Sequence, residues 1–216
     1  MSTDLAIFGG EPIRKEPFPA WPRITEDMKR SLIHTFEEEE WGVGSKTITL
    51  FNEQFATMQD AKYCLSIHSG TSAIWICLKA AGIEAGDEVI LPSYTFIATA
   101  TAVVLANAVP VFADIDKKTA NLDPTSVEKL ITKKTKAIIP VHTAGAPADM
   151  KAFLDISKKY NIPIIEDAAQ GHGSMIENKK VGAIGLGGIF SFQTSKNMSS
   201  GDGGAIVSND ESFIDA

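Results

Sequence analysis

The sequence predicts an α/β fold: a three-layer α/β/α domain built on a mainly parallel, mixed sheet of seven strands. Two observations lead to this fold class. From Tyr63 onward, short apolar runs alternate with segments of helical period, which is the pattern of a parallel sheet covered by helices. Most of these runs are apolar without alternation, as expected for strands buried on both faces. The predicted strands are residues 63–67, 88–91, 109–113, 137–141, 163–166, 188–192 and 205–208.

The segments between these strands carry helix start signals. Thr71 or Ser72 can cap one helix, Asp123 a second and Asp149 a third, because their side chains can accept from the first free backbone N–H groups of a helix. Residues 95–107 are nearly all small or apolar. We therefore expect that helix to be buried against the sheet.

Two amphipathic helices are predicted ahead of the sheet, on either side of a linker at residues 41–45. We expect residues 1–62 to form N-terminal packing helices and an active-site linker, and residues 63–216 to form the α/β large domain. The apolar positions that share a face are Met28, Leu32 and Phe36 in the first helix, and Ile48, Phe51, Phe55 and Met58 in the second.

Composition narrows the class of partner. The net charge of -7 and the isoelectric point near 5.1 argue against nucleic acid or an anionic membrane as the main partner. The two cysteines, Cys64 and Cys77, form neither a disulfide framework nor a zinc site, so no metal is expected. No segment has the length and apolar character of a membrane span, and the N-terminus does not begin a signal peptide. We expect a cytoplasmic protein.

One lysine stands in a context suited to covalent chemistry. Lys196 follows an apolar run, among hydroxyl side chains, and glycines come shortly after it at residues 201–204. Hydroxyls can bind a phosphate, and glycines let the backbone approach a ligand closely. A lysine amine forms a Schiff base with a carbonyl, and pyridoxal phosphate is the common carbonyl cofactor that also needs a phosphate site and an acidic partner.

Other polar motifs fall at the predicted carboxyl ends of strands, where open α/β sheets bind ligands. Residues 68–72 make a small-residue turn into a helix, which is either an anion site or an ordinary cap. Residues 92–96 offer aromatic rings to a planar ligand or plug a strand end. His142 is either structural or functional. Of the carboxylates Glu166 and Asp167, Asp167 is the better candidate to keep a pyridine nitrogen protonated.

Together these motifs resemble the DegT/StrS family in order and spacing, from about Gly9 to Asp210. The family contains pyridoxal-phosphate aminotransferases of fold type I that act on keto-sugars and keto-cyclitols. Leu186 departs from the family pattern, where an acidic residue is frequent. The matching segments are residues 69–71, 86–92, 166–170, 190–196 and 201–204.

The resemblance assigns roles at the cofactor. Lys196 corresponds to the lysine that binds pyridoxal 5'-phosphate covalently, and Asp167 to the partner of its ring nitrogen. Gln170 corresponds to the residue near the 3-hydroxyl, and Phe96 to the aromatic that stacks on the ring. The phosphate site corresponds to Ser69, Gly70, Thr71 and Ser191.

Roles at the substrate are less defined. Tyr94 and His142 are expected to face the substrate together with residues 42–46 and the partner subunit. His172 also matches a family position, with a substrate contact and a structural role as the alternatives.

The implied activity is transfer of an amino group from glutamate or glutamine to a keto-sugar or keto-cyclitol. Such reactions serve the biosynthesis of amino sugars and aminocyclitols, in antibiotics or surface polysaccharides. The family also implies a homodimer with shared active sites. Its members continue for over a hundred residues into a small C-terminal domain, which this sequence does not contain, so we expect a truncated chain.

Three alternatives stay open. A dehydratase of the same family carries a histidine where Lys196 stands. A cysteine desulfurase needs an exposed cysteine on a mobile loop, which Cys64 and Cys77 do not resemble. The third alternative is a catalytically inert fragment or regulator that binds the cofactor.

Overall fold

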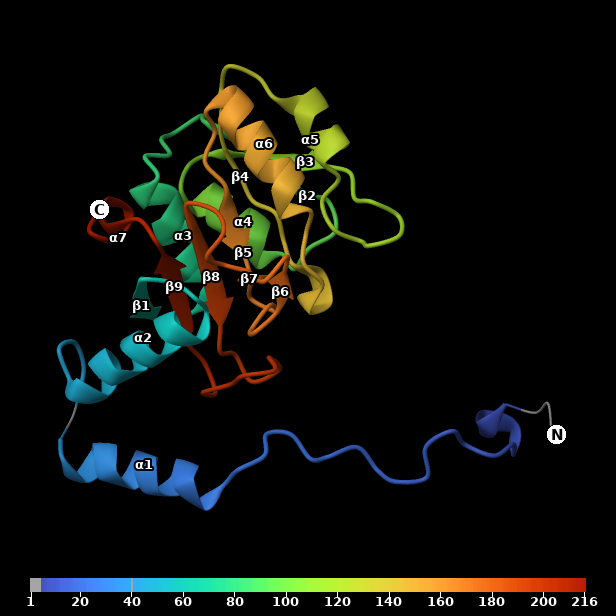
Figure 1. Cartoon of the computed structure of the whole chain (residues 1–216), viewed down its shortest axis with the longest axis vertical. Coiled ribbons are helices and arrows are strands. Elements are labelled where there is room, and N and C mark those ends of the chain that lie inside the picture. The colour runs from blue at the N-terminus through green and yellow to red at the C-terminus, as the bar shows by residue number, and fades with distance from the viewer. Residues whose placement is uncertain (1–4, 40) are drawn as a thin grey trace. The chain divides into compact units, whose positions relative to one another are not determined.

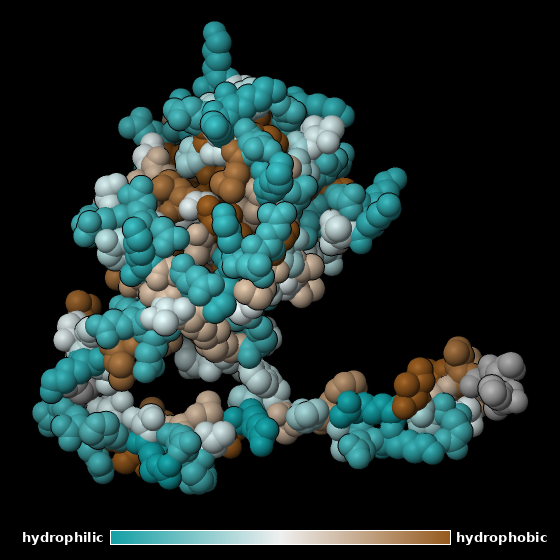
Figure 2. Space-filling model, in the orientation of Figure 1, coloured by the Kyte–Doolittle hydropathy of each residue, from teal (hydrophilic) through white to brown (hydrophobic). Residues whose placement is uncertain are grey.

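The computed structural model describes residues 5–39 and 41–216, and the chain divides into two units between residues 39 and 40 (Figure 1). The first unit contains a short 3-10 helix, η1 (Ala6–Phe8), and α1 (Glu26–Glu37). Thr25 caps α1, since its hydroxyl accepts from the backbone N–H of Met28 at 3.3 Å. No residue of α1 is buried. The packing expected for its apolar face is therefore not seen among the described residues, and hydrophobic side chains lie at the surface of this unit (Figure 2).

The second unit contains the sheet. A four-stranded part has the order β1-β9-β8-β5, and a three-stranded part has the order β3-β2-β4. Isolated parallel bridges, Ile138 to Ile164 and Val141 to Asp167, link the two parts. Neighbouring strands are parallel except at β9, which is antiparallel to β1 and β8. The bounds are β1 (Tyr63–Ile67), β2 (Glu88–Pro92), β3 (Val109–Ala113), β4 (Thr135–Ile138), β5 (Ile165–Asp167), β8 (Gly187–Ser191) and β9 (Gly204–Ser208).

The mainly parallel, mixed sheet is confirmed, and each predicted strand is present with ends shifted by a few residues at most. The structure adds a hairpin of two short strands, β6 (Met175–Ile176) and β7 (Lys179–Lys180). Its turn residues Glu177 and Asn178 have φ of 49° and 61°. Positive φ at both central positions is typical of the tight turns that join two strands directly. Strands of two residues are too short to produce a sequence pattern.

Helices cover both faces of the sheet (Figure 1). Along β2 and β4 the side chains alternate: Val89 and Ala137 face one cluster with α3 and α4, and Ile90 and Ile138 face another with α5 and α6. The three-layer arrangement is therefore confirmed. The bounds are α2 (Lys46–Met58), α3 (Gly70–Ala80), α4 (Ala98–Leu105), α5 (Pro124–Leu130), α6 (Met150–Tyr160) and α7 (Glu211–Ile214).

Two of the three predicted helix caps are confirmed, and the third lies at a different residue. Asp123 and Asp149 cap α5 and α6 as predicted. The cap of α3 is Ser69, not Thr71 or Ser72, because its hydroxyl is the group that accepts from the N–H of Ser72, at 3.2 Å.

Two helices differ in how far they are buried. Helix α4 is shorter than residues 95–107 and only partly buried: Ala102 and Val103 are fully buried, whereas Val104 and Leu105 are more than half exposed. Helix α2 packs on the sheet through Phe55, as expected. No helix in residues 5–39 and 41–216 is long and apolar enough to cross a membrane.

Glycines let a loop lie directly on the sheet beside β5 and β8. A Cβ at Gly188 would overlap the backbone of Gly182, and a Cβ at Gly185 would come within 2.5 Å of the carbonyl oxygen of Ile164. These close approaches exclude any side chain at either position. The loop of residues 182–185 is thereby brought against the strand that carries Glu166 and Asp167.

We expect Gly188→Ala to destabilise the chain more than Gly86→Ala. At Gly188 a methyl group meets backbone, which cannot rotate away, so a loss of about 3 kcal/mol is expected. At Gly86 the φ is 86° and the space is open, so alanine costs only the left-handed conformation, about 1–2 kcal/mol. Urea unfolding of both variants at neutral pH measures the two losses. Equal losses would contradict the close contact.

Candidate active site

A cavity of about 520 Å³ lies where the carboxyl ends of the central strands meet the start of α3. It gathers residues from several segments that are far apart in the chain, because parallel strands end at one edge of a sheet. The predicted residues that line it are Ser69, Gly70, Thr71, Phe96, Asp167, Gln170, Ser191 and Lys196.

The start of α3 gives the cavity an end suited to an anion. The first N–H groups of a helix have no intrahelical acceptor, and the helix dipole is positive there. Gly70 lies against Ser191, since a Cβ at Gly70 would be 2.9 Å from the Cβ of Ser191. Backbone N–H groups and the hydroxyls of Thr71 and Ser191 therefore face the same space. This arrangement can bind a phosphate.

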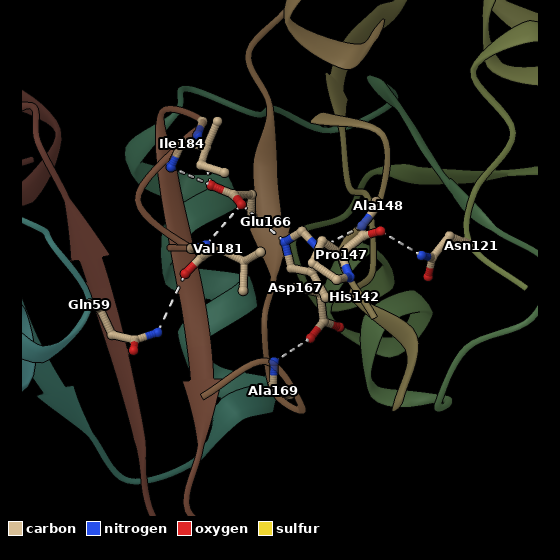
Figure 3. Close-up of polar contacts among 12 residues, drawn as sticks. Gln59, Asn121, His142, Pro147, Ala148, Glu166, Asp167, Ala169, Val181 and Ile184 are labelled. Carbon is tan, nitrogen blue, oxygen red and sulfur yellow. Dashed lines mark hydrogen bonds and ion pairs between the residues drawn. The ribbon is translucent and has the colours of Figure 1, made fainter. Parts of the chain in front are cut away.

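Asp167 is a buried carboxylate at the end of β5, with 5% of its surface exposed. The hydroxyl of Thr99 donates to Oδ2 at 2.7 Å, and the N–H of Ala169 donates to Oδ1 at 3.2 Å (Figure 3 shows the latter). Burial raises the pKa of Asp167. The two hydrogen bonds and the charge of Lys196 act in the opposite direction. A cationic ring nitrogen bound at this carboxylate would compensate its desolvation.

Glu166, the preceding residue, points to the other side of β5 and is fully buried (Figure 3). Oε1 accepts from the backbone N–H groups of Ile184 at 2.8 Å and Gly185 at 2.7 Å. Oε2 accepts from the N–H of Gly182 at 2.8 Å and is 3.0 Å from Nε2 of His142. Glu166 does not line the cavity. Asp167 is therefore the candidate partner for a cationic ring nitrogen.

His142 does not line the cavity and is fully buried. Its Nδ1 accepts from the N–H of Ala148 at 3.1 Å, so the ring proton is on Nε2 and is donated to Glu166. Both ring nitrogens are therefore used within the protein. The structure supports the structural alternative for His142, and no substrate contact follows from its position.

Lys196 lies on a turn that its own neighbours hold together. Its N–H donates to the carbonyl of Gln193 at 2.8 Å. The side-chain oxygen of Gln193 accepts from both the N–H and the hydroxyl of Ser195, at 2.8 and 2.7 Å. The Nζ atom lies 5.9 Å from the centre of the Phe96 ring. The amine and the aromatic face thus border the same cavity, and 69% of Phe96 is exposed.

The other two predicted substrate residues do not line this cavity. Tyr94 is exposed at the surface beyond it. His172 is buried against the rings of Phe55, Phe190 and Phe192, with ring centres 5.2–6.2 Å apart. Burial lowers the pKa of His172 to about 4, and the cation of Lys196 acts in the same direction. His172 is therefore a neutral member of an aromatic cluster.

Sequence reasoning missed several lining residues, namely Thr95, Thr99, Gln193, Ser195 and Asp202. Thr99 had a usable signal. It is a hydroxyl in a nearly apolar helix, and a buried hydroxyl needs a partner, which is Asp167. Gln193 had none, because its role depends on how the turn folds.

We expect Asp167→Asn to stabilise the cofactor-free chain at neutral pH. Burial raises the pKa of Asp167 in the folded state above its value in the unfolded state, so the folded chain binds the proton more tightly. The stability of the unsubstituted chain is therefore greatest below the unfolded pKa, and it is lost as the pH rises through the folded pKa. The advantage of the variant should shrink as the pH approaches about 3.9. Urea unfolding across this pH range tests it, with Asp155→Asn on the exposed face of α6 as control. An Asp167→Asn variant no more stable than the unsubstituted chain would contradict the burial effect.

Comparison with known proteins identifies the family. The model of the DegT/DnrJ/EryC1/StrS aminotransferase family matches residues 22–216. L-glutamine:2-deoxy-scyllo-inosose aminotransferases are similar over nearly the whole chain: that of Streptomyces kanamyceticus is 41% identical over 215 residues, 97% of this chain and 50% of the relative. That of Streptomyces lividus is 37% identical over 219 residues, 99% of this chain and 52% of the relative.

Solved structures agree. The aminotransferase from Psychrobacter cryohalolentis is 38% identical with a TM-score of 0.88, over 91% of this chain and 50% of that one. 3-Amino-5-hydroxybenzoic acid synthase is 38% identical with a TM-score of 0.87, over 90% of this chain and 51% of that one. The chain spans about half the length of these relatives. Since sequence and fold agree over that half, the chain belongs to the DegT/DnrJ/EryC1/StrS aminotransferase family.

Proposed function

We propose that this protein is a pyridoxal-phosphate-dependent aminotransferase that moves an amino group from L-glutamine to a keto-cyclitol of the inosose type. The observation that carries the proposal is the shared cavity of Lys196, Asp167, Phe96 and the start of α3. The named activities of the relatives support the choice of donor and acceptor. An aminotransferase of this kind would serve aminocyclitol biosynthesis.

The residues of the cavity fit the cofactor. The N–H groups at Gly70 and Thr71 with the hydroxyls of Thr71 and Ser191 would bind its phosphate, and a side chain at Gly70 would collide with Ser191. Asp167 is buried and accepts from two donors among the described residues, and it would meet the ring nitrogen. When bound, pyridoxal phosphate supplies an aldehyde that condenses with amines and a protonated ring that withdraws electrons from the reacting carbon.

Each residue would then have a distinct task. Asp167 holds the ring nitrogen protonated, because an adjacent anion favours the cationic form. Nζ of Lys196 would hold the cofactor until the amine of the donor takes its place, and the freed amine would then carry a proton from the donor carbon to C4′ of the cofactor. Phe96 covers one face of the ring and keeps water from it. The presence of lysine rather than histidine at position 196 favours amino transfer over dehydration.

We further propose that the active protein is a cytoplasmic homodimer whose subunits share active sites, with a small C-terminal domain following the large one. Support for a second subunit comes from apolar side chains beside the cavity. Phe96 and Ile97 are each 69% exposed. Apolar groups of this size at the mouth of a site are suited to contact with another protein surface.

We expect Lys196→Ala to lose the visible absorbance of the bound cofactor and all turnover. The methyl group cannot form the covalent link, and the base is removed. Lys158→Ala, on an exposed position of α6, removes a lysine without affecting the site. Absorbance spectra after incubation with pyridoxal phosphate compare the two variants. A Lys196→Ala variant with an unchanged spectrum and activity would exclude the assigned role.

The substrate proposal predicts amine formation from L-glutamine and 2-deoxy-scyllo-inosose. A keto-sugar linked to a nucleotide should react at least about 100-fold less efficiently, since polar groups placed for one hydroxyl pattern are left unpaired by another. Mass spectrometry of the amine product, with each ketone in turn, gives kcat/KM for both. A higher kcat/KM for the nucleotide sugar would contradict the proposal that a cyclitol is the substrate. A cofactor spectrum that does not change on addition of glutamine would favour the inert alternative.

A further inference from the structure

The side chain of Gln170 has a fixed orientation at the edge of the cavity. The backbone N–H of Ala144 donates to its Oε1 at 2.6 Å. An N–H can only donate, so the atom that it meets is the carbonyl oxygen of the amide, and the NH₂ group is at the other end. Within the described part of the chain this NH₂ donates to no protein acceptor. Gln170 lines the 520 Å³ cavity and an adjoining one of about 300 Å³ that Lys196 also lines.

The loop that supplies this N–H has an unfavourable backbone. Ala144 has φ 52° and ψ 25°, in the left-handed region that residues with a side chain seldom adopt. Gly145 follows with φ 81°, and a Cβ there would come within 3.0 Å of the backbone oxygen of Gln170. Such a conformation persists only where surrounding contacts hold it.

Asn121 provides those contacts from outside the cavity. Its side chain is 3% exposed. Its Oδ1 accepts from the N–H of Thr143 at 3.0 Å, and its Nδ2 donates to the carbonyls of Ala146 at 3.1 Å and Pro147 at 3.0 Å (Figure 3 shows Asn121 beside Pro147). One amide is therefore bonded on both sides of the two residues with positive φ. Removal of this amide would leave three backbone groups without their partner.

We propose that Asn121 is a positioning residue for the cofactor site. It acts through residues 143–147 on Gln170, so that the NH₂ of Gln170 points into the cavity and donates to an anionic oxygen of the ligand. The ligand oxygen follows from the proposed function and is the ring oxygen of pyridoxal phosphate. Asn121 itself does not line the cavity.

Two variants of Asn121 separate its contacts. Asn121→Ala removes all three hydrogen bonds. Asn121→Asp keeps the acceptor for Thr143 but places a carboxylate against the carbonyls of Ala146 and Pro147. The matched control is Asn209→Ala, because Asn209 also joins two segments through its amide, accepting from Lys62 and donating to Ala183 at 3.0 Å each, away from the cavity.

The first measurement needs no cofactor. Amide hydrogen exchange at Ala144, followed by NMR on the 216-residue chain, reports whether its N–H stays bonded. We expect exchange at Ala144 to be at least about tenfold faster in both Asn121 variants, relative to the unsubstituted chain, and unchanged in Asn209→Ala. Equal exchange in Asn121→Ala and the unsubstituted chain would overturn the proposal, whether or not the chain binds a cofactor.

The second measurement connects the loop to the ligand. An N–H donor stabilises an anionic oxygen and so lowers its pKa. In Asn121→Ala, where Gln170 is no longer held, the pH at which the visible band of bound pyridoxal phosphate changes should rise by about one unit. The dissociation constant of pyridoxal phosphate should rise about tenfold. Gln170→Glu, which keeps an acceptor for Ala144 and loses the NH₂, should change both in the same direction.

The outcomes distinguish the two proposals. A shift in Gln170→Glu with none in Asn121→Ala would show that Asn121 does not position Gln170. Absence of any visible band in the unsubstituted chain would contradict the proposed function, and hydrogen exchange would still decide the role of Asn121.

Discussion

The buried carboxylate of Glu166 is the interaction on which the rest of the site depends. Four donors surround it: three backbone N–H groups of residues 182–185 and the ring of His142. A carboxylate removed from water is strongly unfavourable unless its oxygens are fully bonded, so these partners must be held in place whenever the chain is folded. The glycines beside it let the loop come close enough to donate. The end of β5 is thereby fixed.

Fixing that strand end determines the environment of the next residue. Adjacent residues of a strand point to opposite faces, so the strand that directs Glu166 into its bonded site directs Asp167 into the cavity. The backbone of Asp167 is held by the adjacent segment, since its N–H donates to the carbonyl of Pro140 at 2.9 Å and its carbonyl accepts from the N–H of His142 at 3.1 Å. One carboxylate is saturated by the protein, and its neighbour keeps capacity for a ligand. The contrast in bonding separates a structural acid from a candidate functional one.

The sequence allowed much of this to be predicted, for identifiable reasons. Apolar runs locate strands because burial on both faces requires them, and the motifs around Asp167 and Lys196 are local. Other features depend on residues far apart in the chain that share no periodic pattern. The bonds from Asn121 to residues 143–147 and from Glu166 to residues 182–185 are of this kind.

Local geometry explains the remaining differences. Ser69 caps α3 because the helix begins at Gly70, two residues before the start that a cap at Thr71 would give. Helix α4 has an exposed face although its residues are small and apolar, since hydrophobicity does not report which neighbours cover a helix. The amphipathic pattern of α1 correctly predicted a helix. It also predicted that the apolar face would be packed, but no residue of α1 is buried.

The direction of β9 has a consequence for how the site assembles. Because β9 runs antiparallel between β1 and β8, the last strand of the sheet in sequence is inserted between the first strand and a late one. The segment with Lys196 connects β8 to β9, which pair with each other and are close in the sequence. The strands β1 and β9 also pair, but they are far apart in the sequence. Contacts between remote segments form slowly. Lys196 and Ser191 can therefore be brought together before the start of α3, which follows β1, is attached to the same sheet.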